Sequence, residues 1–339
     1  MLRNYRLALL AASVQLILAQ PSMAADSALI TAAQREGIVR WYTVVLVEEA
    51  VRPLVAAFKK SYPGIEVAFE RDISPANARK IIAEAAAPRA DVFDGSITAA
   101  ALLQAGLVAP YKPDSAKDIP DQFKDKDGYW TALLLEFNSL GRNTDLVPES
   151  ATPRSWAELL DPRWHGKIVW SVRDGLTSGA GVVANVLSSM GESEGFAYLA
   201  RLKQQKIAGI NGDGPAVLRE ISSGRYALAL QIFTHHTVIE RGRGAHVDWV
   251  PLEPVLGFSN NIGLVKNAPH PNAGKLLIDF ILSVGGQTII RDANHIPASS
   301  KVEALVPSLK TGFQVNFMSP AMVAAHGTEW QAIFDRLFR

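Results

Sequence analysis

Two adjacent histidines, His235 and His236, form the most chemically versatile cluster in this sequence of 339 residues. They follow an apolar run, 226–233, and are enclosed by Thr234 and Thr237. Such a run is typical of a buried parallel strand, and open α/β sheets bind ligands at the carboxyl ends of their strands. Because strand side chains alternate, both rings can serve one ligand only from an irregular loop or from the start of a helix.

Imidazole nitrogens can bind a metal or hydrogen-bond an anion, and the sequence favours the second role. A third metal ligand is missing nearby, because His246 lies beyond the basic turn 241–244. Chance adjacency of the two histidines in a loop is the alternative. The chain contains no cysteine, which excludes thiolate catalysis and Cys-ligated metal sites. We therefore expect neither a resident metal nor a cofactor.

Two segments place hydroxyl groups where a predicted strand is followed by a predicted helix. They are 94–98 (DGSIT) and 177–181 (TSGAG). Unpaired backbone N–H groups and the helix macrodipole favour an anion at such positions. The serines could instead be simple N-caps. The ligand-binding residues predicted from these segments are Asp94, Ser96, Thr98, Thr177, Ser178, Gly179 and Ala180.

Three further polar residues are expected in the same site. Tyr42 and Thr43 end a strand predicted at 37–43, and Asn260 interrupts a strand predicted at 258–265. Side chains at strand ends and interruptions are available to a ligand, whereas those inside a buried strand are not.

Motifs of the common hydrolases and nucleotide-binding enzymes are absent from the sequence. It contains no G-x-S-x-G, H-E-x-x-H or G-x-x-x-x-G-K-[ST]. An exported hydrolase that uses Asp91, Asp94 and His235 is a remote alternative. We expect that the protein is not an enzyme.

Strand and helix patterns alternate along the chain. Strands are predicted at 37–43, 65–69, 90–93, 129–137, 167–171, 206–210, 226–233, 246–250 and 258–265. Helices are predicted at 48–62, 76–87, 97–104, 155–160, 181–190, 194–205, 214–223, 272–282, 285–293 and 326–338. The alternation predicts an α/β fold with a parallel sheet and right-handed crossovers. The second half repeats the alternation, so we expect it to form a second unit with its own sheet.

The first 25 residues have the pattern of a secretory signal peptide. Arg3 and Arg6 precede an apolar stretch, 7–19, and small residues at 22–25 supply a cleavage point. The apolar stretch is too short to anchor the chain in a membrane, so we expect an exported protein. Loss of the two arginines takes the formal net charge from +1 to −1, which argues against nucleic acid or an anionic membrane as a partner.

Several phrases of the chain resemble the bacterial extracellular solute-binding proteins of the ferric-iron-binding type. These are the periplasmic components of ATP-binding-cassette importers, and similar sequences bind phosphonates, sugar phosphates, thiamine or polyamines. The phrases that carry the resemblance are AFKKSYPGIEV (57–67), ADVFDGS (90–96), LLQAGLVAPY (102–111), SWAELLDPRWHGKIVW (155–170) and KNAPHPNAGKLLIDFILSVGGQ (266–287).

The resemblance implies a type II periplasmic binding protein fold, in which two α/β lobes close on a ligand. Lobe one would contain 26–136 and 257–339, and lobe two 137–256. Hinge strands would lie near 136–137 and 257–258. Together with the sites above, this predicts a periplasmic monomer that captures a small anionic solute, bearing phosphate, phosphonate or carboxylate, and delivers it to a membrane permease.

An iron-binding role is the alternative that the resemblance leaves open. Ferric-binding members carry a Tyr-Tyr pair at the position occupied here by His235 and His236. Ferric ion favours phenolate and carboxylate oxygen, whereas imidazole suits softer divalent metals. An iron site would therefore need Tyr42 and a carboxylate beside the two histidines, with a synergistic anion at Ser178.

Overall fold

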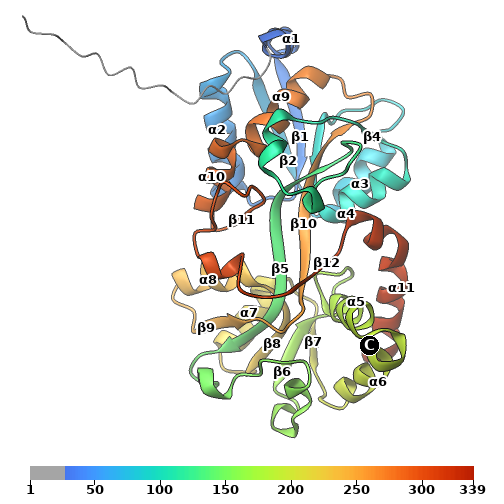
Figure 1. Ribbon diagram of the computed structural model, residues 1–339, viewed down its shortest axis with the longest axis vertical. Helices are drawn as coiled ribbons and strands as arrows, with labels where there is room; N and C mark the ends of the chain where they lie inside the picture. Colours follow the sequence, from blue (N-terminus) through green and yellow to red (C-terminus); the bar gives the residue numbers. More distant parts are fainter. Residues whose placement is uncertain (1–26) are drawn as a thin grey trace, which may run out of the picture.

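Two α/β lobes joined by a pair of long strands make up the computed structural model, which describes residues 27–339 (Figure 1). The predicted signal peptide, residues 1–25, lies outside the described residues. Each lobe has an apolar core of its own, built on opposite sides of the cleft between them.

The strands of the first lobe are β1 (Ile38–Thr43), β2 (Glu66–Arg71), β3 (Val92–Asp94) and the short β4 (Val108–Ala109). Within it β1 pairs in parallel with both β2 and β3, whereas β4 pairs antiparallel with β10 (Val255–Val265). Its helices are α1 (Ser27–Glu36), α2 (Arg52–Ser61), α3 (Ser74–Ala83), α4 (Ser96–Gln104), α9 (Pro271–Leu282) and α10 (Val284–Asp292). Alternation along β1 turns Trp41 toward α2 and α9, and Tyr42 toward α3 and α4 on the opposite face.

The second lobe repeats this plan. Its strands are β6 (Ile168–Ser171), β7 (Ala208–Ile210), β8 (Leu228–Phe233) and β9 (Val247–Val250). Its helices are α5 (Gly179–Met190), α6 (Glu192–Lys203), α7 (Gly214–Ser222) and α8 (Thr234–Gly242). β6 pairs in parallel with both β7 and β8, as a βαβ alternation requires.

Two long strands, β5 (Thr131–Asn143) and β10 (Val255–Val265), run from one lobe to the other (Figure 1). They pair antiparallel, with Phe258 opposite Glu136, and their register shifts between Asn260 and Asn261. The expected interruption of this strand is therefore a bulge-like irregularity.

The sheet differs from the two separate parallel sheets that we expected. β10 pairs antiparallel with β3, and β5 pairs antiparallel with β8, so a single mixed sheet of order β2-β1-β3-β10-β5-β8-β6-β7 passes through both lobes. The reason is that β5 and β10 contribute one end to each lobe. The short β11 (Ile296–Pro297) and β12 (Val315–Phe317) pair with β5 and β10 respectively.

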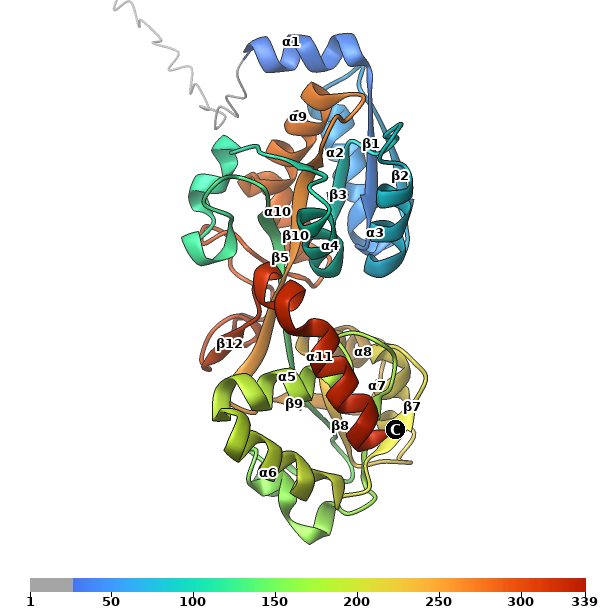
Figure 2. The same cartoon turned by 90° about the vertical axis from the view of Figure 1, so that its right-hand side faces the viewer.

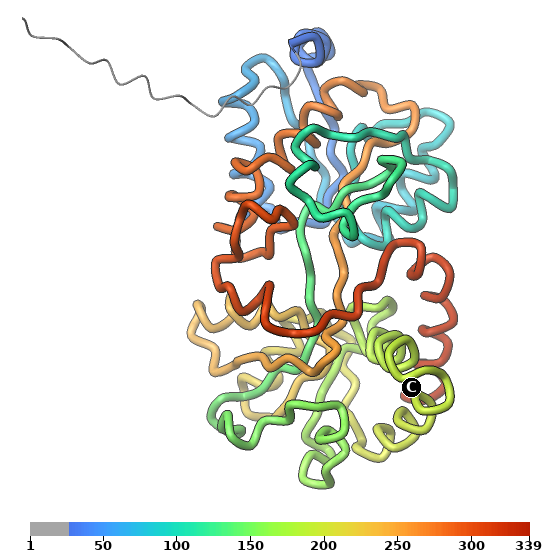
Figure 3. The backbone as a smooth tube through the Cα atoms, in the orientation of Figure 1, coloured from blue at the N-terminus to red at the C-terminus, as the bar shows by residue number. Residues whose placement is uncertain are grey.

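The C-terminal helix corrects the expected boundary of lobe one, which assigned all of 257–339 to it. Figure 3 shows the chain passing between the lobes a third time before it reaches α11 (Pro320–Phe338). α11 packs along the second lobe (Figure 2), where the Phe334 ring lies 5.2 Å from that of Trp170. Its apolar stripe of Trp330, Ile333 and Phe334 completes the core of that lobe, and burial of these side chains holds the helix there.

Within residues 27–339, no single helix is both long and apolar enough to cross a membrane. The pair α9 and α10 reaches that length and composition together, but the two helices are bent by 63° at their junction.

Candidate functional site

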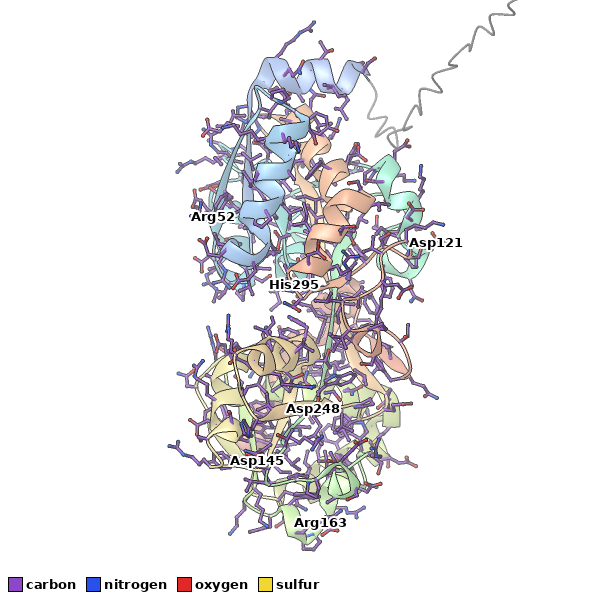
Figure 4. The ribbon with its side chains drawn as sticks, turned by 90° about the vertical axis from the view of Figure 1, so that its left-hand side faces the viewer. Arg52, Asp121, Asp145, Arg163, Asp248 and His295 are labelled. Atoms are coloured by element: carbon purple, nitrogen blue, oxygen red, sulfur yellow. The ribbon has the colours of Figure 1, made fainter. Side chains whose placement is uncertain are left out.

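A cavity of about 440 Å³ lies between the two lobes. Its floor includes Leu134 and Glu136 of β5, and its walls come from both lobes. Figure 4 places His295 on the first lobe where that lobe faces the second. A larger hollow, of about 810 Å³, lies around Arg142 and Trp249 and contains none of the predicted site residues. The candidate site is therefore the interlobe cavity.

Five helices begin at this cavity. α3 and α4 reach it from the first lobe with Ser74 and Ser96, and α5, α7 and α8 reach it from the second with Ser178, Gly214 and His235. Only α7 has a side-chain N-cap. The positive ends of the macrodipoles of the other four helices therefore favour an anion in the cavity, although in α4 the Thr98 N–H already donates to Ser74 Oγ at 2.8 Å.

His235 and His236 lie in the first turn of α8, which begins directly after β8. This is the helix start that lets two successive rings face one ligand. Their ring centroids are 4.5 Å apart, and the ring of His295 lies 5.1 Å from that of His235. His295 comes from the other lobe, between α10 and β11. The sequence did not predict it, because a single histidine in a loop carries no pattern.

His235 and His295 are buried, His236 is half-buried, and several of their ring nitrogens lack partners among the described residues. Nδ1 of His235, Nδ1 of His236 and both ring nitrogens of His295 make no hydrogen bond to any residue of the range 27–339. Burial lowers the pKa of His236 and that of His295 to about 4, and lowers the pKa of His235 well below its usual range. At neutral pH the rings are therefore uncharged, and each can donate one hydrogen bond and accept another.

Two arginines that the sequence analysis missed line the same cavity from opposite lobes. Arg71 ends β2, and Arg173 follows β6 by two residues. Neither guanidinium makes an ion pair or a hydrogen bond with any other described residue. Both follow the carboxyl end of a strand, the signal that marked the histidines. That signal was not decisive here, because basic residues at strand ends are also common on ordinary surfaces.

Glu136 is the third unpaired charge, on the crossing strand β5. Its half-buried carboxylate makes no hydrogen bond or ion pair within the described residues. Burial, and after it the charge of Asp94, raises the pKa of Glu136 to about 7. The cavity thus presents two unpaired cations at its walls and one unpaired carboxylate at its floor, while its other two carboxylates, Asp174 and Asp213, pair with Arg339 and cap α7.

Half of the predicted ligand-binding residues line the cavity. The structure brings together Ser96, Thr177, Ser178, His235, His236 and Asn260. Neither serine forms the side-chain cap that was the alternative: Ser96 is already helical, and Ser178 donates its hydroxyl to Gly175 O at 2.6 Å.

Three of the other predicted residues are buried beneath the cavity lining, where they make hydrogen bonds to neighbouring residues. Asp94 is fully buried, and it accepts hydrogen bonds from Trp41 Nε1 at 2.7 Å and Asn260 Nδ2 at 3.1 Å. Burial raises its pKa to about 6. The Thr43 hydroxyl accepts from Val45 N at 3.0 Å, and the Thr98 hydroxyl lies 2.8 Å from that of Ser74. None of the three lines the cavity, because each is directed into the sheet or the adjoining helix.

Gly179 and Ala180 are also absent from the cavity. They lie inside α5, where a Cβ atom on Gly179 would fall 2.2 Å from the Phe334 ring. The glycine is needed for the approach of α11, which the sequence analysis assigned to the other lobe.

Tyr42 does not meet the histidines. Its hydroxyl donates to the carboxylate of Glu84 at 3.2 Å, and Lys80 Nζ lies over its ring at 4.5 Å. Lys80 lies in the last turn of α3 and Glu84 follows that helix, and neither residue nor Tyr42 lines the cavity. The predicted iron set is therefore not assembled, and the described part of the chain holds no group of three or more His, Asp or Glu residues arranged for a metal.

Residues 87–323 match the family described as bacterial extracellular solute-binding protein. The chain belongs to this family. This binding protein is 26% identical over 256 residues to a Salmonella typhimurium protein named "Putative 2-aminoethylphosphonate-binding periplasmic protein", covering 73% of each chain. It is 33% identical over 162 residues, or 44% of each chain, to a periplasmic-binding protein of an ABC transporter from Sinorhizobium fredii, whose name is qualified as "probable".

Solved structures share the fold of this binding protein. The periplasmic binding protein P5PA has a TM-score of 0.73 at 22% identity, with coverage of 89% of this chain and 100% of that one. AfuA from Actinobacillus pleuropneumoniae, with fructose-6-phosphate bound, has a TM-score of 0.72 at 20% sequence identity, with coverage of 89% of this chain and 98% of that one. Iron-bound HitA from Pseudomonas aeruginosa has a TM-score of 0.74 at 21% sequence identity, with coverage of 87% of this chain and 98% of that one. The predicted type II periplasmic binding protein fold is confirmed.

The family also confirms the predicted class and location. Its members are binding proteins, and the named relatives are periplasmic. This chain is a periplasmic solute-binding protein.

Proposed function

We propose that this protein captures a small organic anion, bearing phosphate, phosphonate or carboxylate, and delivers it to the permease of an ATP-binding-cassette importer without chemical conversion. The observation that carries the proposal is the convergence of five helix N-termini on one interlobe cavity, to which each lobe adds an unpaired arginine.

The placement of the two arginines suggests how an anion would drive closure. Arg71 and Arg173 carry like charges on opposite sides of the cavity, so an anion bound between them is attracted by both. Each guanidinium can form two parallel hydrogen bonds with a phosphonate or carboxylate. A ligand held by both lobes stabilises the closed form more than the open one, and the crossing of β5 and β10 would serve as the hinge.

The neutral histidines fit the same ligand. Their free nitrogens can donate to an oxyanion or accept from a hydroxyl or an amine, without adding charge. The Salmonella relative is named for an aminoalkylphosphonate, and AfuA was solved with a sugar phosphate. Both ligands carry a phosphorus oxyanion, which supports the proposal. Iron is less well supported, because Tyr42 does not line the cavity and is engaged by Glu84 and Lys80.

Native mass spectrometry of protein purified without denaturation would identify a ligand that co-purifies. Isothermal titration with phosphonates, sugar phosphates and carboxylates would then rank them. We expect Arg71→Ala and Arg173→Ala each to weaken binding of the best anion about tenfold or more, since each removes a charge-assisted contact.

Arg35→Ala, at the end of α1 outside the cavity lining, is the matched control and should bind as the unaltered protein does. Unchanged affinity in both cleft variants would contradict the proposal. A visible charge-transfer band on titration with ferric citrate would favour the iron alternative instead.

A further inference from the structure

The floor of the interlobe cavity differs in charge from its walls. Glu136 lies at the middle of β5 and lines the cavity, yet no described side chain pairs with it. A carboxylate in a partly desolvated position is unfavourable unless a cation or hydrogen-bond donors compensate it. Its pKa, raised to about 7, reports the same missing compensation. Between residues 27 and 339, no cation lies within ion-pair distance of this carboxylate.

A second acceptor without a partner lies beside Glu136. Asn260 is only 2% exposed, and its Nδ2 donates to Asp94. That bond fixes the orientation of the amide and leaves Asn260 Oδ1 with no hydrogen bond. In the antiparallel pairing of β5 with β10, Asn260 lies opposite Leu134 and therefore diagonal to Glu136 on the same face. Both residues line the cavity.

The charged and titratable groups around this floor leave its negative charge uncompensated. Asp94 is acidic, and the three histidines are neutral at pH 7 because burial lowers their pKa values. Neither lining arginine has a nitrogen within ion-pair distance of Glu136. The charged and titratable groups that line the cavity or pack against its floor are Arg71, Asp94, Arg173, Asp174, Asp213, His235, His236 and His295. Of these, Asp174 pairs with Arg339.

We infer that Glu136 and Asn260 Oδ1 form a cation subsite, which takes the ammonium group of a ligand whose oxyanion lies against Arg71 and Arg173. The inference rests on the proposed anion site and narrows its ligand to amino-substituted organic anions. An ammonium group has three donors and a full positive charge, so it can satisfy a carboxylate and an amide oxygen together. An anion without an amine leaves Glu136 unpaired when the lobes close over it.

The test compares ligand pairs that differ by one amino group. The pairs are 2-aminoethylphosphonate with ethylphosphonate, β-alanine with propionate, and glucosamine 6-phosphate with glucose 6-phosphate. For the pair that binds best, isothermal titration of the unaltered protein should give at least tenfold tighter binding of the amino form. Glu136→Gln should reduce that preference to about twofold or less, with the amine-free anion binding as well as before or better.

Glu149→Gln is the matched control, since Glu149 is an exposed glutamate that does not line this cavity. Thermal unfolding of both variants would establish that they fold. Because the preference is also measured on the unaltered protein, a variant that fails to fold leaves the test intact.

Two results would overturn the inference, and they are distinguishable. Equal binding of the amino and amine-free members, or an equal loss of both in Glu136→Gln, would remove the cation subsite and leave the anion site standing. Binding of none of the six anions would remove the anion site as well.

Discussion

The end of β8 and the end of β1 show how differently two similar junctions can serve one cavity. Both strands end in polar residues after an apolar run. After β8 the chain turns at once into α8, and the rings of His235 and His236 face the cavity. After β1 it continues extended, so that Val44 lines the cavity while Thr43 is buried. The sequence can thus locate a junction correctly, while the residues that line the cavity there differ from the predicted ones by a position or more.

The histidines and the carboxyl groups at and beneath the cavity also differ in the way they respond to acid. The pKa values of the three histidines are lowered in the folded protein. Their contribution to the free energy of unfolding is therefore complete above pH 6.5 and is lost as the pH falls toward 4. Asp94 and Glu136 have raised pKa values, of about 6 and about 7. Their contribution is complete near pH 4 and is lost as the pH rises through those values.

The largest expected effect is therefore a change in the pH dependence of stability. Between pH 6.5 and 4, His295→Gln should reduce the loss of unfolding free energy by about 1.4 kcal/mol per pH unit, the value for one proton. Glu136→Gln should make the loss on acidification steeper. Denaturant unfolding at several pH values measures both slopes. Parallel curves for His295→Gln and the unaltered protein would show that this ring titrates normally.

The next effect should separate the two junctions by ligand affinity. Replacing both His235 and His236 with alanine should weaken binding of the best anion about a hundredfold, because two buried hydrogen bonds to a charged ligand are lost. Thr43→Val should lose its bond to Val45 N and about 1 kcal/mol of stability, with affinity nearly unchanged. Titration calorimetry and thermal unfolding measure the two. If the double alanine variant bound normally, the adjacency of the histidines would be accidental.

A third change tests the junction before α5, where Thr177 and Ser178 line the cavity but Gly179 does not. Gly179→Ala should destabilise the protein by about 2 kcal/mol, since the new Cβ overlaps the Phe334 ring. Gly327→Ala on α11, whose Cβ would meet Val323 at an ordinary 3.7 Å, should be neutral or slightly stabilising. Thermal unfolding compares them. Equal melting temperatures would mean that α11 is not held at Gly179.

The smallest effect is expected at Tyr42. Tyr42→Phe removes weak contacts of 3.2 Å to Glu84 and should cost less than about 1 kcal/mol of stability, with ligand affinity changed less than twofold. Titration calorimetry with the best anion measures this. A loss of affinity as large as that of the double histidine variant would place Tyr42 in the site and restore the iron hypothesis.

The sequence by itself determined the elements and their alternation, because apolar periodicity and glycine or proline stops are local properties. β2, α4, α7 and β8 were predicted to within about two residues at most of their ends. The two crossing points near 136–137 and 257–258 were also marked, and the structure pairs them side by side. That this crossing acts as the hinge stays a prediction.

Only the tertiary structure decided which polar residues meet. The period of β1 separates Trp41 from Tyr42 but does not say which face looks toward the ligand. His295 contacts His235 although the two lie 60 positions apart in the sequence, and Arg71 and Arg173 line one cavity from different lobes. α11 packs on the second lobe because the Phe334 ring fits against Trp170 and over Gly179, which has no side chain. Such contacts depend on how distant surfaces fit together, and no local pattern in the chain records that fit.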